Sequence, residues 1–232
     1  TTLLSEIQFE NYLNRKELDF SFNFTISEME SSVRFRGNCY FERGNMAVAL
    51  RIIPKMVRLI EHLLLPKQLH EVARKRQGLF LVTGPTGHGK STTLAAIVQE
   101  INMTRNCHIV TIEDPIEYIF ASDRAVIHQR EIGIDTTSFN EALRRVLRQD
   151  PDVIMIGEMR DLETMRAALT AAETGHLVLT TLHTPDAPQS IDRILDVFPP
   201  HQQDQVKLQL ANILIGICSQ QLIPLPGGGR IV

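Results

Sequence analysis

A glycine-rich run in the first half of the chain has the residue types of a phosphate-binding loop. Its residues, Gly84 to Ser91, read GPTGHGKS and match the pattern G-x-x-x-x-G-K-[ST]. The glycines let the backbone curl so that its N–H groups point at phosphate oxygens, and a following helix adds partial positive charge. In such a loop we expect Lys90 to reach the β- and γ-phosphates and the hydroxyl of Ser91 to bind Mg²⁺.

The context of this loop favours nucleotide binding over its alternative, a glycine-rich turn without a ligand. The apolar run 79–83 precedes it as a strand would, and residues from Thr92 onward continue as a helix, which is the setting that the motif requires. The chain is therefore predicted to bind ATP with Mg²⁺. The residues expected to contact the nucleotide are Gly84, Pro85, Thr86, Gly87, His88, Gly89, Lys90, Ser91 and Thr92.

A carboxylate follows another apolar run. Residues 153–156 read VIMI and are followed by Gly157 and Glu158. An acid at the carboxyl end of a strand lies where ligands bind in open α/β sheets, so Glu158 is a candidate to activate the attacking water or to hold it against Mg²⁺. Many nucleotide motors carry aspartate where this chain has Gly157. The alternative for Glu158 is a solvated acid at the start of the next helix.

A second acidic group follows residues 109–112. Three carboxylates within five residues, Glu113, Asp114 and Glu117, are compatible with organising Mg²⁺ and water at a strand end. The alternative is an ordinary acidic strand end, because Asp-Pro is a turn signal. The candidate Mg²⁺ ligands, some of them through water, are Ser91, Glu113, Glu117 and Glu158.

Two histidines flank the apolar run 177–181. His176 precedes it and His183 follows it, and either imidazole is a candidate donor to the γ-phosphate. The alternative is that each is a packed or surface histidine.

The elements expected to position these groups indicate a parallel sheet. From about residue 67, apolar runs at 79–83, 109–112, 153–156 and 177–181 alternate with helical patterns. Ser138 and Glu141 predict a capping box at one helix start, and apolar residues from Val206 to Ile217 predict a later amphipathic helix. Continuous apolar strands that alternate with helices are typical of a sheet covered on both faces.

The first part of the chain has a different pattern. Residues 17–22 and 33–36 alternate polar and apolar side chains, and 47–53 is a third strand candidate. Pro54 and Pro66 bound a segment that reads as a hinge. The predicted organisation is a partial N-terminal domain at 1–57, a linker at 58–66 and a nucleotide-binding domain at 67–232. The chain starts at Thr1 and stops as a strand is expected to begin, which predicts a fragment of a longer protein.

Composition argues against several other classes. The net charge of −3 disfavours a protein whose main role is to coat nucleic acid or anionic lipid. No apolar run approaches the ~20 residues of a membrane span, and no signal peptide is visible. Cys39, Cys107 and Cys218 are far apart, which suggests neither a disulfide framework nor a CxxC metal site and fits a reducing compartment.

Four segments together resemble a known family. GPTGHGKST, TIEDPIEY, VIMIGEMRD and TGHLVLTTLHT, in this order, are similar to the boxes of the secretion ATPase superfamily of type II and type IV pilus machines, and most similar to its pilus-retraction branch. The resemblance also covers residues 17–22, 129–131, 162–174 and 191–194. It implies an α/β chain with a RecA-like P-loop ATPase domain built on a parallel sheet, preceded by part of a small PAS-like α+β domain, and assembled as a homo-hexamer.

The resemblance also assigns roles by position. Glu113 and Glu117 lie in the family's Asp box, Glu158 resembles its Walker B glutamate, and His176 and His183 match its His-box histidines. The family supplies arginines from the N-terminal domain to the nucleotide. The residues in the matching region are Arg36, Arg43 and Arg51, for which the alternative is a solvated strand face. Arginine fingers contribute ~10³–10⁵ in rate in other nucleotide enzymes.

The function implied is a hexameric ATPase motor that powers pilus retraction and twitching motility, at the cytoplasmic face of a bacterial inner membrane and against a platform protein in that membrane. Residues 220–227 contain no cysteine pair, whereas extension and secretion relatives carry a four-cysteine zinc module there, which favours retraction. A pilus-extension or type II secretion ATPase and a weakly hydrolysing accessory subunit remain alternatives. A RecA-like nucleic-acid motor would need a basic channel with stacking aromatics, and no nucleic-acid partner is expected.

Overall fold

The computed structural model describes residues 3–26, 31–54, 56–225 and 230–232. The chain divides into two compact units, which are described separately below. The N-terminal unit contains Thr1–Met56 and Glu117–Ile119, and the C-terminal unit contains Val57–Ile116 and Phe120–Val232. The predicted separation of 58–66 as a linker stays a prediction. Residues 226–229, where the sequence places the glycine run, lie outside the described residues.

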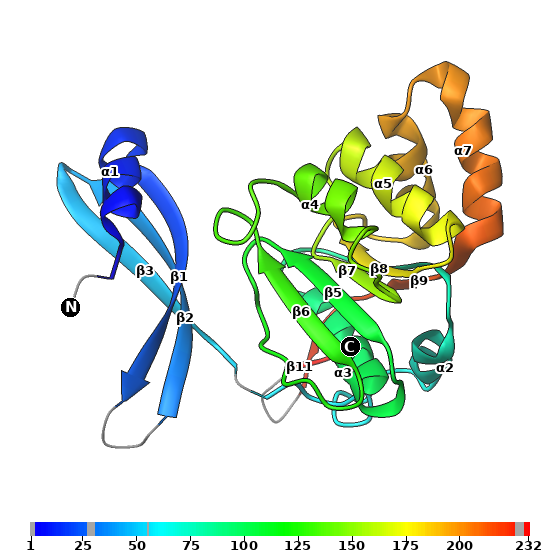
Figure 1. Ribbon diagram of the computed structural model, residues 1–232, viewed down its shortest axis with the longest axis horizontal. Coiled ribbons are helices and arrows are strands. Elements are labelled where there is room, and N and C mark those ends of the chain that lie inside the picture. The colour runs from blue at the N-terminus through cyan, green and yellow to red at the C-terminus, as the bar shows by residue number, and fades with distance from the viewer. Residues whose placement is uncertain (1–2, 27–30, 55, 226–229) are drawn as a thin grey trace. The chain divides into compact units, whose positions relative to one another are not determined.

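The N-terminal unit is one helix beside an antiparallel sheet in the order β1-β2-β3 (Figure 1). Its elements are α1 (Glu6–Arg15), β1 (Glu17–Ile26), β2 (Ser31–Glu42) and β3 (Asn45–Ile53). The three predicted strands lie within β1, β2 and β3 and are confirmed. Tyr12 joins the helix to the sheet, because its ring stacks on Phe41 at 4.9 Å between centroids and its hydroxyl donates to the carbonyl of Tyr40 at 2.8 Å.

The C-terminal unit is built on a parallel sheet of six strands in the order β6-β5-β7-β8-β4-β9. The strands are β4 (Gly78–Thr83), β5 (His108–Glu113), β6 (Val126–Glu131), β7 (Val153–Ile156), β8 (Leu177–Leu182) and β9 (Leu214–Ser219). Strands β4, β7 and β8 are buried along their whole length, which the continuous apolar runs predicted. The parallel α/β fold is confirmed.

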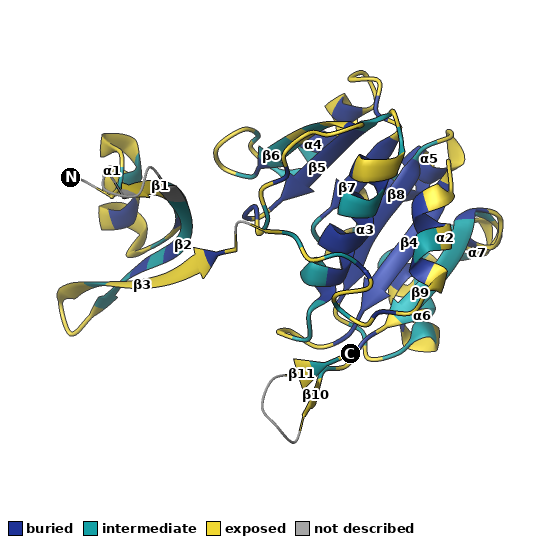
Figure 2. Cartoon of the chain, turned by 90° about the horizontal axis from the view of Figure 1, so that it is seen from below, coloured by how far each residue is buried: buried dark blue, intermediate teal, exposed yellow. Residues whose placement is uncertain are grey.

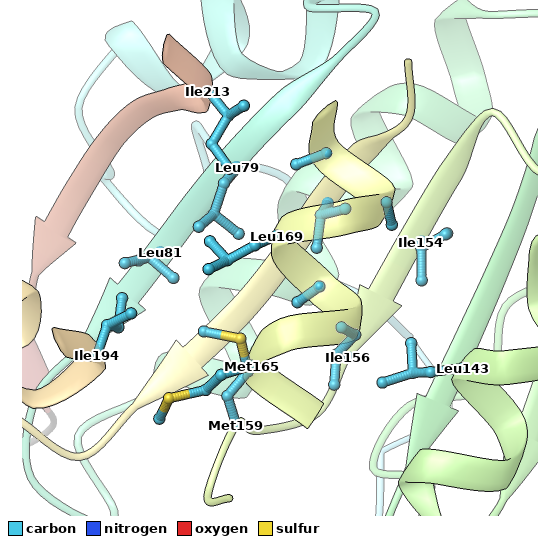
Figure 3. Close-up of a cluster of buried hydrophobic side chains, with 14 of the residues drawn as sticks. Leu79, Leu81, Leu143, Ile154, Ile156, Met159, Met165, Leu169, Ile194 and Ile213 are labelled. Atoms are coloured by element: carbon cyan, nitrogen blue, oxygen red, sulfur yellow. The ribbon is translucent and has the colours of Figure 1, made fainter. Parts of the chain in front are cut away.

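Helices cover both faces of this sheet (Figure 1 and Figure 2). The helices α2 (Gln68–Arg74) and α3 (Lys90–Thr104) lie on one face, and α4 (Phe139–Val146), α5 (Leu162–Glu173), α6 (Ala187–Val197) and α7 (Pro200–Ile213) lie on the other. Side chains of β4 and β7 pack against α5 in the main core, with Leu81, Ile156 and Leu169 among them (Figure 3). Two short strands, β10 (Ile223–Pro224) and β11 (Arg230–Ile231), pair antiparallel. Among the described residues, no helix combines the length and apolarity of a membrane span.

Two local predictions are corrected. The helix expected through Ile217 ends at Ile213, and the chain continues as β9, which pairs with β4 from Leu79 to Thr83. Pairing with the sheet satisfies backbone groups along this apolar segment, and a helical spacing of apolar residues cannot reveal that.

The capping box is only half formed. The hydroxyl of Ser138 accepts from the backbone N–H of Glu141 at 3.2 Å, so the N-cap is confirmed. The carboxylate of Glu141 instead faces the guanidinium groups of Arg144 and Arg145, at 3.8 and 3.6 Å. Opposite charges one helical turn apart attract, and this competes with the reciprocal cap.

Because α5 packs against the sheet, truncating a buried leucine on it should lower the free energy of unfolding far more than truncating an exposed leucine. Leu169 is 2% exposed in the main core, whereas Leu208 on α7 is 69% exposed. Leu169→Ala should lower the free energy of unfolding by about 2–5 kcal/mol because it leaves a cavity. Leu208→Ala, the matched control, should change it by less than about 0.5 kcal/mol. Urea unfolding followed by circular dichroism measures both, and equal effects would contradict the packing described here.

Candidate functional site

The candidate site lies where four neighbouring strands end. Strands β7, β8, β4 and β9 are adjacent and parallel, so their carboxyl ends share one edge of the sheet. Glu158 follows β7, His183 follows β8, the loop from Gly84 follows β4, and Gln220 follows β9. Ligands bind at this edge in open α/β sheets, so strand order alone brings these residues to one place.

Two glycines of the loop have a steric reason to lack a side chain. Gly84 has φ of 141° and Gly89 has φ of 83°, a region that L residues rarely adopt. A Cβ on Gly84 would lie 2.2 Å from the carbonyl oxygen of Gln220, and a Cβ on Gly89 would lie 2.9 Å from its side-chain nitrogen. At Gly84 the loop therefore passes too close to the backbone of Gln220 for any side chain.

The amino terminus of α3 has no side-chain cap. The N-cap is Gly89, which offers no side-chain cap, and the first turn carries no acidic residue. The first N–H groups of a helix have no partner within the helix, and the helix dipole adds partial positive charge there. This geometry suits a phosphate group.

Lys90 is folded into the loop. Its ammonium group donates to the carbonyl oxygens of Gly84 at 2.9 Å and Pro85 at 3.0 Å, and its residue is 7% exposed. Its nitrogen also lies 3.4 Å from Nδ1 of His183. The positive charge is thus held at the centre of the loop.

Glu158 and His183 are connected to the loop by hydrogen bonds. Nε2 of His183 lies 3.2 Å from Oε2 of Glu158, and Nδ1 of His183 lies 3.3 Å from the hydroxyl of Thr86. Arg160 forms an ion pair with the other carboxylate oxygen of Glu158. The Glu158 side chain is 15% exposed, so water reaches it in part.

Glu113 is a buried carboxylate at the end of β5. Its residue is 5% exposed, and Oε1 accepts from the hydroxyl of Thr111 at 2.7 Å and the amide of Gln129 at 3.3 Å. Gly157, where many motors have aspartate, lies beside it, since a Cβ there would be 3.6 Å from the Cα of Glu113. An acid therefore occupies the strand end next to Gly157.

His176 does not reach the loop. It precedes β8, whereas His183 follows it, and a strand of this length separates its two ends by about 20 Å. Nδ1 of His176 instead lies 2.9 Å from the carbonyl oxygen of Ala171. The structure brings His183 to the loop and leaves His176 at the opposite edge. Glu117 is grouped with the N-terminal unit, and its predicted part in holding Mg²⁺ stays a prediction.

The three candidate arginines lie in the N-terminal unit in two places. Arg36 of β2 and Arg51 of β3 are direct cross-strand partners. Arg34 shares their face, as predicted for Arg34 and Arg36, and donates to the hydroxyl of Ser21 at 2.7 Å. Arg43 lies in the turn after β2, with a side chain 91% exposed. The structure thus brings Arg36 and Arg51 together, but not Arg43.

A cavity of about 420 Å³ adjoins the loop. Gly89, Thr92 and Thr93 line it from the start of α3, and Gln220 and Leu222 line it from the segment after β9. The remaining lining residues are Arg58, His62, Leu63, Leu64, Leu65, Leu225, Arg230, Ile231 and Val232. Seven of the lining residues are aliphatic and six are polar or basic.

The cysteines do not contribute reactive groups. All three thiols are free, and burial raises the pKa of Cys39, Cys107 and Cys218 above its ordinary value. A raised pKa keeps a thiol protonated at neutral pH, which makes it a poor nucleophile and a poor metal ligand.

Sequence reasoning missed Arg160 and Gln220. Arg160 had a local signal, because it lies two residues beyond the candidate Glu158 in the same segment. Gln220 had no such signal. A helix was predicted through Ile217, so the strand β9, which ends next to Gln220, was not recognised.

Comparisons with known proteins agree with this geometry. The profile of the family described as "Type II/IV secretion system protein" matches residues 14–226. The chain is 48% identical over 223 residues to the type IV pilus retraction ATPase PilT of Pseudomonas aeruginosa, covering 96% of this chain and 62% of that protein. It is 46% identical over 232 residues to a twitching motility protein of Neisseria gonorrhoeae, covering all of this chain and 61% of that protein.

A solved structure of the pilus retraction motor PilT with bound ADP superimposes with a TM-score of 0.92 at 50% identity, covering 98% of this chain and 65% of that one. The chain thus spans about six-tenths of the length of the curated relatives it matches. Since the family profile covers most of its residues, the chain belongs to the type II/IV secretion system protein family.

Proposed function

We propose that this chain is the nucleotide-hydrolysing part of a motor that uses Mg·ATP to power type IV pilus retraction. The observation that carries the proposal is the meeting of the loop, Glu158 and His183 at the carboxyl ends of three adjacent parallel strands. Retraction itself comes from the names of the relatives, one a pilus retraction ATPase and one a twitching motility protein.

The loop is proposed to hold the phosphates. The open amino terminus of α3 and the ammonium group of Lys90 supply positive charge from two directions. The cavity beside Thr92 and Thr93 is proposed to take the base and ribose, because it begins where the loop ends and seven of its fourteen lining residues are aliphatic.

The proposed Mg²⁺ ligands are one hydroxyl and three carboxylates. They are Ser91, Glu113, Glu117 and Glu158, some of them through water. The donor set fits the ion, since Mg²⁺ prefers carboxylate, hydroxyl and water oxygens, and Glu113 presents a buried carboxylate beside Gly157. When bound, the ion would neutralise charge on the phosphates.

Glu158 is proposed as the general base for the attacking water. It is an acid at a strand end beside the loop, partly accessible to water. His183 is proposed to donate to the γ-phosphate, because its imidazole already lies within reach of Lys90 and Thr86. His176 is the weaker candidate for donation to the γ-phosphate, since it lies at the other end of β8.

Arginines of the N-terminal unit are proposed to add positive charge to the phosphates in the assembled motor. Arg36 and Arg51 are the better candidates, because like charges directly opposite each other on a sheet destabilise it unless an anion faces them. Arg43 is the weaker candidate, since it lies in the turn and pairs with Glu42 at 3.9 Å.

The assembly and setting are proposed with the function. The motor is a homo-hexamer that acts at the cytoplasmic face of the inner membrane on a platform protein in that membrane. A pilus-extension or secretion ATPase, and a weakly hydrolysing accessory subunit, would use the same loop and acids.

The first prediction separates binding from hydrolysis. Lys90→Ala should weaken Mg·ATP binding by about 10–100-fold, because it removes a charge-assisted contact to phosphate. Glu158→Gln should bind near the parent value but turn over about 10²–10⁴-fold more slowly. Calorimetric titration and a phosphate-release assay measure the two quantities. Glu163→Gln, an exposed acid on α5, is the control. Parent-like hydrolysis by Glu158→Gln would remove Glu158 from its role.

The second prediction concerns assembly. A site that needs arginines from an N-terminal unit is expected to be completed in a ring, so hydrolysis per chain should rise as hexamers form. Sedimentation velocity and ATPase assays over the same range of protein concentration test this. An active monomer would contradict it.

The third prediction separates retraction from extension. Loss of the gene should leave cells piliated but unable to twitch, and elemental analysis of the protein should find no stoichiometric zinc, because no cysteine pair with CxxC-type spacing is present in the sequence. Cells that lose their pili, or one zinc ion per chain, would point to an extension or secretion motor.

A further inference from the structure

Gln220 is a buried polar side chain whose amide is bonded at both ends. It follows β9 and is 2% exposed. Its Oε1 accepts from the hydroxyl of Thr93 at 2.7 Å, and its Nε2 donates to the carbonyl of His88 at 2.6 Å. One side chain therefore joins the phosphate loop to the first turns of α3.

The backbone of Gln220 contacts the same region. Its N–H donates to the carbonyl of Thr83, the last residue of β4, at 2.8 Å. Its own carbonyl oxygen occupies the space that a Cβ on Gly84 would need. Gln220 thus contacts the strand before the loop, the loop itself and the helix after it.

The hydrogen bond from Gln220 to the carbonyl of His88 sets the direction of the next amide, the N–H of Gly89. In a planar trans peptide, the carbonyl of one residue and the N–H of the next point to opposite sides. Because the carbonyl of His88 is turned toward Gln220, the N–H of Gly89 is turned away from it. That N–H belongs to the loop and lies at the N-cap of α3, where it is one of the donors available to a phosphate.

We propose that Gln220 is a positioning residue for nucleotide binding, which holds the His88–Gly89 peptide in the orientation that presents its N–H to phosphate. The inference rests on the proposed nucleotide-binding function. The next residues extend the same contact, since the N–H of Leu222 donates to Nδ1 of His88 at 3.1 Å. Gln220 and Leu222 also line the cavity beside the loop, so one segment contacts both parts of the site.

Glutamine is the residue type that these contacts require. The amide offers an acceptor to Thr93 and a donor to the carbonyl of His88, and no apolar residue offers either. A glutamate would place carboxylate oxygens against the carbonyl of His88, which repels them. A methionine has similar length but leaves the buried hydroxyl of Thr93 and the carbonyl of His88 without this partner.

The experiment compares two adjacent glutamines. Gln220→Met and Gln220→Glu are the test variants, and Gln221→Met and Gln221→Glu are the matched controls, because Gln221 is exposed. Calorimetry measures the Kd of Mg·ADP, thermal unfolding without nucleotide measures fold stability, and hydrogen exchange follows the amides from Gly87 to Ser91. ADP is the probe, so that hydrolysis does not enter the result.

The expected result is confined to Gln220. Gln220→Met should raise the Kd about 10-fold, the effect of losing one or two hydrogen bonds, and Gln220→Glu should raise it further. Exchange of the loop amides should quicken while the strands of the sheet stay protected. The Gln221 variants should match the parent chain in all three measurements.

A third variant tests which bond matters. Thr93→Val removes only the hydroxyl bond to Gln220 and keeps the bond to His88, so it should weaken Mg·ADP binding less than Gln220→Met. An equal effect would overturn the role given to the His88 bond.

Three outcomes would contradict the positioning role, and one of them would also contradict nucleotide binding. If the parent binds Mg·ADP and Gln220→Met binds it within about twofold, a difference too small for a lost hydrogen bond, the positioning role is wrong and nucleotide binding stands. Weakening that comes with faster exchange throughout the sheet would also overturn the role, because it would show a loss of fold. If the parent chain does not bind Mg·ADP, both proposals fail.

Discussion

The open amino terminus of α3 is the constraint around which the candidate site is arranged. Its first N–H groups have no partner within the helix, and the N-cap, Gly89, has no side chain to supply one. A chain that leaves these groups for a ligand must bend sharply between β4 and α3, and the positive φ angles of Gly84 and Gly89 make that bend. The buried ammonium group of Lys90 bonds to carbonyls of the loop and closes it.

Strand order explains what surrounds this loop. Strand β4 lies between β8 and β9, and Thr83 is in register with Leu182 on one side and Ser219 on the other. The next residues along the flanking strands are His183 and Gln220, so both reach the loop without any further element. His183 connects to the acid Glu158, whereas Gln220 contacts backbone and the hydroxyl of Thr93. One side of the loop thus carries the residues proposed for the chemistry, and the other side bonds to the backbone of the loop.

The sequence predicted the parts of the site that are local. The loop, the apolar strands and Glu158 are each contained in a short segment whose pattern is sufficient to recognise it. Gln220 is not, because its partner His88 lies 132 residues away and only the pairing of β9 with β4 brings them together. The apolar residues of β9 also continue the helical spacing of α7, so periodicity could not separate strand from helix.

The two histidines show a different limit. Both flank the same strand and both match a family box, but a strand has two ends about 20 Å apart, and only one of them lies at the loop. Elementary strand geometry separates His183 from His176 once β8 is known to be parallel to β4. Motif similarity treats the two residues alike, because it carries no information on the direction in which the strand runs.

Glu158 and two residues of the loop contact the same imidazole, that of His183. One carboxylate oxygen pairs with Arg160 and the other faces Nε2 of His183, so a water that approaches the carboxylate must compete with one of these partners. The second nitrogen of the same imidazole lies 3.4 Å from the ammonium of Lys90 and 3.3 Å from the hydroxyl of Thr86. A phosphate bound in the loop would accept hydrogen bonds from these same groups. One imidazole thus lies between the proposed base and the groups proposed to bind phosphate.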